Sequence, residues 1–171
     1  MTSIDHAGVP RFVERGPQPY VAHRARVTST SIPEIADRIP EVLAWLDGRA
    51  ITPSGPPFLR YSVISMPDLL VVEAGFPVDA LQALDADDEV LSGKLPAGRY
   101  LTVRHHGPPM GLAEATADLL AWAAQRNLRF DVQNLDDGEH WACRLEEYLT
   151  APADDPTMAN WDTDLTFKLA D

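Results

Sequence analysis

The stretch Tyr20-Val-Ala-His-Arg-Ala25 has a similar counterpart later in the chain, Tyr100-Leu-Thr-Val-Arg-His105. This pair of stretches decides the fold. Both place an arginine four residues after a tyrosine, in a pattern typical of a short strand. Each is followed by a helical pattern that reaches the same triplet, Leu43-Ala44-Trp45 and Leu120-Ala121-Trp122. The spacing from tyrosine to tryptophan is 25 residues in the first case and 22 in the second, so one three-residue insertion reconciles them. We interpret the match as a tandem duplication of one supersecondary unit.

Two strand patterns follow each helical pattern. Residues 58–65 and 69–78 predict a hairpin around Met66-Pro67-Asp68, and residues 141–149 and 163–169 predict its counterpart. Pro40 predicts a kink or a late start in the first helix. The prediction is one α+β domain over residues 1–171, built from strand–helix–strand–strand repeats at about 10–78 and 94–170 with a linker at 79–93. Pairing of the two repeats in an antiparallel sheet would bury their free edges and leave a ligand cleft between them.

Composition and charge exclude several functions. The chain has 45% hydrophobic and 23% charged residues, which is typical of a globular domain, and it has no apolar run long enough to span a membrane. The net charge of -12 argues against nucleic-acid binding, which requires clustered Lys and Arg. Residues 131–171 hold eleven acidic and two basic residues, a solubilising face that could also attract a basic protein partner. The absence of a signal-peptide pattern and the single cysteine, Cys143, favour a cytoplasmic location.

The predicted strand at 141–149 carries the main candidate site residue. The first of its two faces carries Trp141, Cys143, Leu145, Glu147 and Leu149, and the second carries Ala142, Arg144, Glu146 and Tyr148. Leu145 and Leu149 predict a core-facing side. A carboxylate at Glu146, in a partly buried strand, is costly unless it is paired or protonated. Two interpretations stay open: Glu146 pairs with Arg144 and bonds to Tyr148, or it is an anionic anchor for organic cations or for acid–base chemistry.

Other residue types that could carry chemistry give weaker signals. Phe58 and Tyr61 begin the equivalent strand of the first repeat, and alternation puts them on opposite faces. The adjacent His105 and His106 point apart on a strand, so we expect no metal site there. Cys143 is expected to be a buried small hydrophobe. The sequence has no glycine-rich phosphate loop, so no cofactor is predicted.

The chain resembles the gyrase-inhibitor-like small-molecule-binding domains, which also serve as effector domains of multidrug-sensing transcription regulators. The resemblance covers roughly residues 10–170 in the family's order. The matching segments are Arg24 and its strand, Gly55-Pro-Pro-Phe-Leu-Arg-Tyr61, Glu73-Ala-Gly-Phe-Pro-Val78, Leu95-Pro-Ala-Gly-Arg-Tyr100, His106-Gly-Pro108, Gly111-Leu112, the helix that reaches Trp122, and Glu146-Glu-Tyr148. Many relatives have Gly-Pro-Tyr where this chain has Gly107-Pro108-Pro109, so one pocket aromatic is replaced.

The resemblance implies a duplicated fold whose cleft binds lipophilic, often cationic, compounds. A glutamate two residues before a tyrosine projects into that cleft in the family, and this position is Glu146 here. The candidate walls are Tyr61, Tyr148, Trp122, Tyr100 and Phe58. Because the chain has no helix-turn-helix segment, we expect it to bind no DNA itself. One alternative is a hydrolase that opens strained rings of genotoxic compounds, with Glu146 as the general base. The other is an acidic protein-interaction module.

Overall fold

The structure is a computed structural model that describes residues 8–65, 69–85 and 88–171. Its strands are β1 (Arg11–Arg15), β2 (Gln18–Val27), β3 (Phe58–Ser65), β4 (Leu69–Pro77), β5 (Leu91–Leu95), β6 (Gly98–His106), β7 (Val132–Leu135), β8 (Gly138–Trp141), β9 (Arg144–Tyr148) and β10 (Asp162–Lys168). Its helices are α2 (Ile32–Ala36), α3 (Ile39–Asp47) and α4 (Leu112–Gln125), the last preceded by the 3-10 turn η1 (Pro109–Gly111). The α+β class predicted from the sequence is confirmed.

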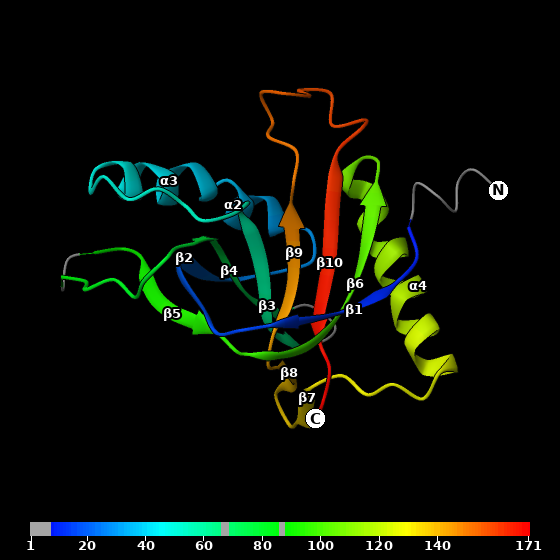
Figure 1. Cartoon of the computed structure of the whole chain (residues 1–171). Coiled ribbons are helices and arrows are strands. Elements are labelled where there is room, and N and C mark those ends of the chain that lie inside the picture. Colours follow the sequence, from blue (N-terminus) through cyan, green and yellow to red (C-terminus); the bar gives the residue numbers. More distant parts are fainter. Residues whose placement is uncertain (1–7, 66–68, 86–87) are drawn as a thin grey trace.

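The strands form one curled antiparallel sheet in the order β1-β6-β10-β9-β3-β4-β2-β5 (Figure 1). The hairpin of β7 and β8 continues from β9 and also pairs with β3. Strands β3 and β9 join the N-terminal part of the sheet to the C-terminal part, with Phe58 opposite Glu147 and Leu59 opposite Glu146. This junction fixes which side chains of the two parts become neighbours.

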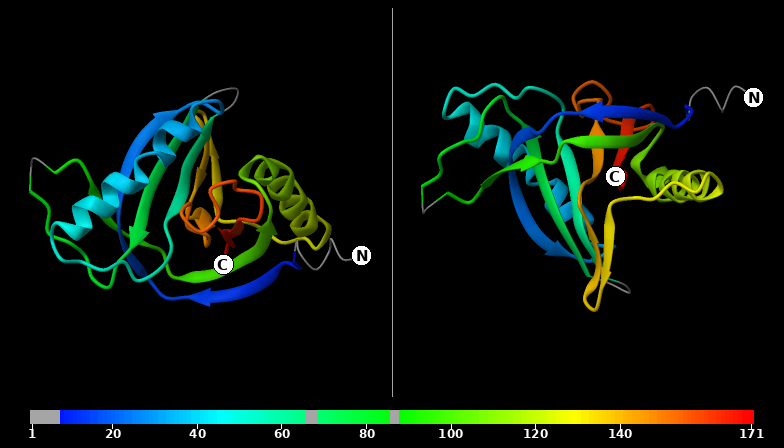
Figure 2. Two further views of the ribbon diagram at one scale, coloured as in Figure 1. Left: turned by 90° about the horizontal axis from the view of Figure 1, so that it is seen from above. Right: turned by 60° about the horizontal axis from the view of Figure 1, so that its bottom comes forward.

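The helices cover the sheet at two separate places, and Figure 2 shows α2 and α3 on one side of β9 and α4 on the other. Helices α2 and α3 pack on β2 and β4, with Ile35, Val42 and Leu46 buried beneath them. Helix α4 packs through Leu112, Leu119 and Ala123 on a cluster that includes residues of β6 and β10. Together with the partly buried Ala115 and Trp122, these residues form the apolar face of α4.

The interruption expected near Pro40 divides the first helical segment into two helices. Helix α2 ends at Ala36, and α3 begins at Ile39 with Pro40 in its first turn. Proline fits a first helical turn because the amide groups of that turn have no partner within the helix. The Met66-Pro67-Asp68 turn lies outside the described residues.

The single strand predicted at 141–149 is wrong in its extent. The ladder breaks at Ala142 and Cys143, which separate β8 from β9, because the Ala142 amide donates to the Asp131 carbonyl at 2.9 Å instead of to a neighbouring strand. The break also changes the direction of side chains. Trp141 packs on Phe167 and not in the cluster that holds Cys143 and Leu145, so it does not share their face as expected.

The structure also differs from the expectations for Leu149 and for the linker at 79–93. Leu149, predicted to be core, lies just beyond β9 and is 39% exposed. The last part of the predicted linker forms β5, which adds to the edge of the sheet beside β2. In the described part of the chain, no helix is long and apolar enough to cross a membrane.

Candidate functional site

Glu146 lies at the centre of a small polar cluster on the helix-covered side of β9. Its Oε1 accepts two hydrogen bonds, at 2.7 Å from the Tyr148 hydroxyl and at 3.1 Å from the Tyr61 hydroxyl. Tyr148 follows two residues later on the same strand, and Tyr61 reaches across from β3. The junction of β3 and β9 therefore brings together three of the residues predicted for the site.

Arg144 shares this face of β9, but it does not form an ion pair with Glu146 in the described structure. Its guanidinium lies over the rings of Trp141 at 4.7 Å and Phe167 at 4.8 Å. Cation–π contacts of this kind stabilise a partly desolvated cation. The first interpretation of Glu146 is therefore met only in part: the hydrogen bond with Tyr148 is present, and the direct ion pair with Arg144 is absent.

Burial controls the protonation of this cluster. Desolvation raises the pKa of the Glu146 carboxyl, and the hydrogen bonds from Tyr148 and Tyr61 and the charge of Arg144 oppose that rise only in part. The pKa values of both tyrosines lie well above their usual value, first because of burial and then because of the charge of Glu146. Burial also lowers the pKa of Arg144. A carboxyl with such a raised pKa can change its charge when a cation arrives.

We expect this raised pKa to make the stability of the protein depend on pH through Glu146. A carboxyl whose pKa in the folded protein exceeds its usual value of 4.5 stabilises the fold below that value, and the contribution is lost as the pH rises through the raised pKa. Glu146→Gln should therefore unfold at higher urea concentration than the wild type at about pH 7.5, and the gap should narrow toward about pH 5. Urea unfolding of both proteins at each pH measures the gap, and a gap independent of pH contradicts the prediction.

The aromatic surroundings of Glu146 come from two hydrophobic clusters that meet at Tyr148. Tyr148 packs against the cluster under α4 and also against the cluster under α2, which contains Leu59 and Tyr61. Trp122, on α4, packs against the first of these clusters, and Arg126 lies 3.9 Å from its ring. Glu146 is therefore located where the apolar layers of the two helical segments adjoin.

The structure does not bring the other two predicted wall residues to Glu146. Tyr100 and Phe58 are both buried in a third cluster together with Tyr20, Cys143 and Leu145. The Tyr100 hydroxyl donates to the Pro96 carbonyl at 2.6 Å. Phe58 stands on the opposite face of β3 from Tyr61, as strand alternation predicted.

Sequence reasoning missed a second buried carboxylate, Glu73, on β4. Its side chain is fully buried, and it accepts hydrogen bonds from the Tyr20 hydroxyl at 2.7 Å and from Arg24 Nε at 3.0 Å. Arg60 lies on its other side, with Nη1 at 3.5 Å from a Glu73 oxygen. Strand register puts Glu73 opposite both arginines, in a basic-acidic-basic row across three strands that becomes visible only once the register is known.

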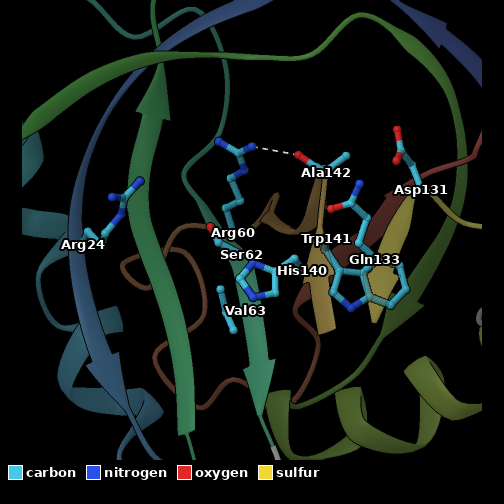
Figure 3. A pocket seen from close by; sticks show the side chains of 9 residues that line it. All are labelled: Arg24, Arg60, Ser62, Val63, Asp131, Gln133, His140, Trp141 and Ala142. Atoms are coloured by element: carbon cyan, nitrogen blue, oxygen red, sulfur yellow. Dashed lines mark hydrogen bonds between the residues drawn. The ribbon is translucent and has the colours of Figure 1, made fainter. Parts of the chain in front are cut away.

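Two surface pockets lie elsewhere, and neither has Glu146 in its lining. A pocket of about 430 Å³ is lined by Arg24, Arg60 and residues of β3, β7 and β8, and Figure 3 shows it from close by. A second, of about 350 Å³, lies near Arg15, Phe58 and Glu147. In the described ranges no group of three or more His, Cys, Asp or Glu side chains could hold a metal ion. Cys143 is buried, and burial raises the pKa of its thiol.

Glu146 is thus a half-buried carboxylate between two apolar layers of a curled sheet that helices cover at two places. The chain belongs to the GyrI-like family, because residues 9–170 match the model described as GyrI-like small molecule binding domain. A comparison with curated proteins finds no match.

Solved structures agree on the fold. The C-terminal domain of EcmrR superposes with a TM-score of 0.71 at 17% identity, over 95% of this chain and 97% of that one. SAV2435 bound to tetraphenylphosphonium gives a TM-score of 0.64 at 10% identity, over 95% and 94% of the two chains. A hydrolase encoded by lin2189 from Listeria innocua gives 0.59 at 11% identity, over 94% and 91%. At these identities the likeness shows a shared fold and no more.

Proposed function

We propose that the chain binds hydrophobic, cationic small molecules at Glu146, between α2 and α4. The observation that carries the proposal is the Glu146 carboxylate, which two tyrosine hydroxyls hold within apolar surroundings. Among the residues that the structure describes, no basic group forms an ion pair with it. A cation that binds beside Glu146 compensates the carboxylate for the solvation it loses on burial, and the cation also contacts aromatic faces. Cationic ligands are therefore favoured over neutral ones of equal shape.

We further propose that the ligand cleft lies between two duplicated units. Strands β2 and β6 share a pattern in which three buried residues begin at Tyr20 and at Tyr100. The arginine four residues after each tyrosine pairs with an acidic residue of a neighbouring strand, Arg24 with Glu73 and Arg104 with Asp164. Arginines also lie over both matched tryptophans four residues later, at 3.8 Å for Trp45 and 3.9 Å for Trp122. Such equivalent contacts support a duplication, with Glu146 near its axis.

We expect Glu146→Gln to weaken binding of tetraphenylphosphonium by about tenfold or more, which corresponds to about 1.4 kcal/mol. The neutral triphenylphosphine oxide, of similar shape, should lose less than about twofold, because it gains nothing from the carboxylate charge. Isothermal titration calorimetry with both compounds measures the two ratios.

Glu147→Gln is the matched control, because Glu147 is the next residue on β9 and bonds instead to Arg15 and Thr166 on the other face of the sheet. This variant should leave both affinities within about twofold of the wild type. Equal losses of affinity for the cation and the neutral compound in Glu146→Gln would contradict the role of Glu146 as an anionic anchor. If the wild type binds neither compound, the proposed ligand class is wrong.

A hydrolase acting on strained rings is the second candidate, and the raised pKa of Glu146 favours it. A carboxyl with a pKa closer to neutrality is a better general base for an attacking water molecule. Incubation of the wild type with styrene oxide should then release the diol, and Glu146→Gln should not. An unchanged epoxide concentration with the wild type excludes this reaction and leaves the binding proposal intact.

A further inference from the structure

The pocket of about 430 Å³ has a chemistry opposite to that of the Glu146 site. Arg24 and Arg60 both line it, although the chain as a whole carries a net charge of -12. Arg60 occupies the face of β3 opposite to Tyr61, since neighbouring strand residues alternate. The two sites are therefore separated by the sheet, and the pocket is independent of the proposed function.

The charges around this pocket leave one positive charge unbalanced. Two guanidinium groups, of Arg24 and Arg60, face the single carboxylate of Glu73. Asp131, also in the lining, pairs with Lys168 Nζ at 2.8 Å, so it does not neutralise the arginines. His140 is hydrogen-bonded to Asp137. The Arg24 side chain is 56% exposed, whereas that of Arg60 is only 16% exposed and shares its one counter-charge with Arg24. Because a largely desolvated cation with only part of a counter-charge is costly, the pocket favours an anion next to Arg60.

Arg60 is held by two hydrogen bonds, and its buried Nε has no partner in the described part of the chain. Its Nη1 donates to the Tyr20 hydroxyl at 2.9 Å, and its Nη2 donates to the Ala142 carbonyl at 2.7 Å (Figure 3). Its buried Nε has no hydrogen-bond partner among the residues that the structure describes. A guanidinium fixed in this way is pre-organised for an oxyanion, because little side-chain freedom is lost on binding.

The rest of the lining supplies polar groups and a short apolar wall. Gln133 on β7 stands across the pocket from Arg24 in Figure 3, and Ser62 lies at the irregularity of β3 between Tyr61 and Val63. Trp141, Val63 and Ala142 add apolar surface. We propose that this pocket binds a small molecule through an oxyanionic group, a carboxylate or a phosphate, whose body lies against the apolar wall.

Gln133→Glu tests this proposal with little risk to folding, because Gln133 is exposed at the end of a short hairpin. A carboxylate added to the pocket should weaken benzoate and phenyl phosphate by about tenfold, since like charges a few ångströms apart repel by about 1 kcal/mol or more. Gln125→Glu makes the same change at the exposed end of α4 and should change neither affinity by more than about twofold. Isothermal titration calorimetry at low salt gives the affinities.

Further variants and ligands in the same titrations distinguish the possible outcomes. Glu146→Gln should bind both anions as the wild type does. A failure of the anion-pocket proposal can therefore be distinguished from a failure of the proposed cation site at Glu146. Tighter binding of benzoate assigns the pocket to carboxylates, which match its single unbalanced charge, and tighter binding of phenyl phosphate assigns it to phosphates. No anion binding by the wild type up to about 10 mM, equal binding of neutral benzyl alcohol, or an unchanged affinity in Gln133→Glu would each overturn the proposal.

Discussion

Glu73→Ala is expected to lower the free energy of unfolding by about 3 to 5 kcal/mol, the cost of removing one partner from a buried ion pair. The Glu73 side chain is fully buried between β2 and β3, so its removal takes a buried partner from the groups that face it. Without it the Tyr20 hydroxyl loses its acceptor, and the pKa of that hydroxyl is already raised by burial and by the charge of Glu73. Arg60 loses the counter-charge that lies 3.5 Å from its Nη1.

Two companion variants separate charge from volume in this prediction. Glu73→Gln keeps the size of the side chain and an acceptor for Tyr20, so it should cost about 2 kcal/mol, as expected for hydrogen bonds to charged groups. Glu41→Ala breaks the exposed Arg38–Glu41 pair on α3 and should cost less than about 1 kcal/mol. Urea unfolding of all three variants gives the values. A loss of stability in Glu73→Ala as small as that in Glu41→Ala would contradict the role assigned to the buried Glu73 carboxylate.

The site at Glu146 was largely predictable from the sequence, because it depends on local alternation. Glu146 and Tyr148 share a face for the simple reason that they are two residues apart on a strand. Tyr61 could be added only through the resemblance to a family, since its neighbour Glu146 is 85 residues away and comes from another part of the sheet. Trp122 was predictable from the helical spacing of α4, which fixes its apolar face.

The errors have one physical origin, which is tertiary pairing that overrides a local pattern. Residues 141–149 read as one strand, but Ala142 leaves the ladder to bond with Asp131. Tyr100 was a candidate wall of the site, yet it lies on β6 with its ring in the cluster of Phe58 and Cys143. The row of Arg24, Glu73 and Arg60, in which Glu73 is buried and Arg24 is exposed, is visible only when the register of β2, β3 and β4 is known.

The two faces of β3 also explain how one small domain could offer the two chemically different sites proposed above. Tyr61 directs its hydroxyl to Glu146, and Arg60, its neighbour in sequence, directs its guanidinium to the other face. A ligand at either site contacts the same strand. The order of the central strands β2, β3 and β4 is therefore a requirement of both proposed sites, and any change that separates these strands should affect both.

Gly75→Ala makes such a change and is expected to lower the free energy of unfolding by about 3 kcal/mol or more, at the upper end of overpacking costs. Gly75 lies in the middle of β4, opposite Ala22 of β2 and Phe58 of β3. An added Cβ would meet the Ala22 Cβ at 2.6 Å and the Ala22 Cα at 2.8 Å, closer than side-chain atoms approach in folded proteins. Because the obstacle belongs to a paired strand and not to a flexible side chain, relief requires β2 and β4 to separate.

Gly16→Ala is the control for this variant, because an added Cβ at Gly16 would have nothing within 4 Å. It should stay within about 0.5 kcal/mol of the wild type, as surface substitutions usually do. Urea unfolding compares the two variants, and hydrogen exchange of the Val21 and Ala22 amides reports on the strand contact itself. Since β4 carries Glu73 and holds β3 in register, Gly75→Ala should also weaken ligands at the Glu146 site and in the Arg60 pocket together. A Gly75→Ala protein as stable as Gly16→Ala would mean that β2 and β4 tolerate separation, and the shared dependence of the two sites on this contact would then be wrong.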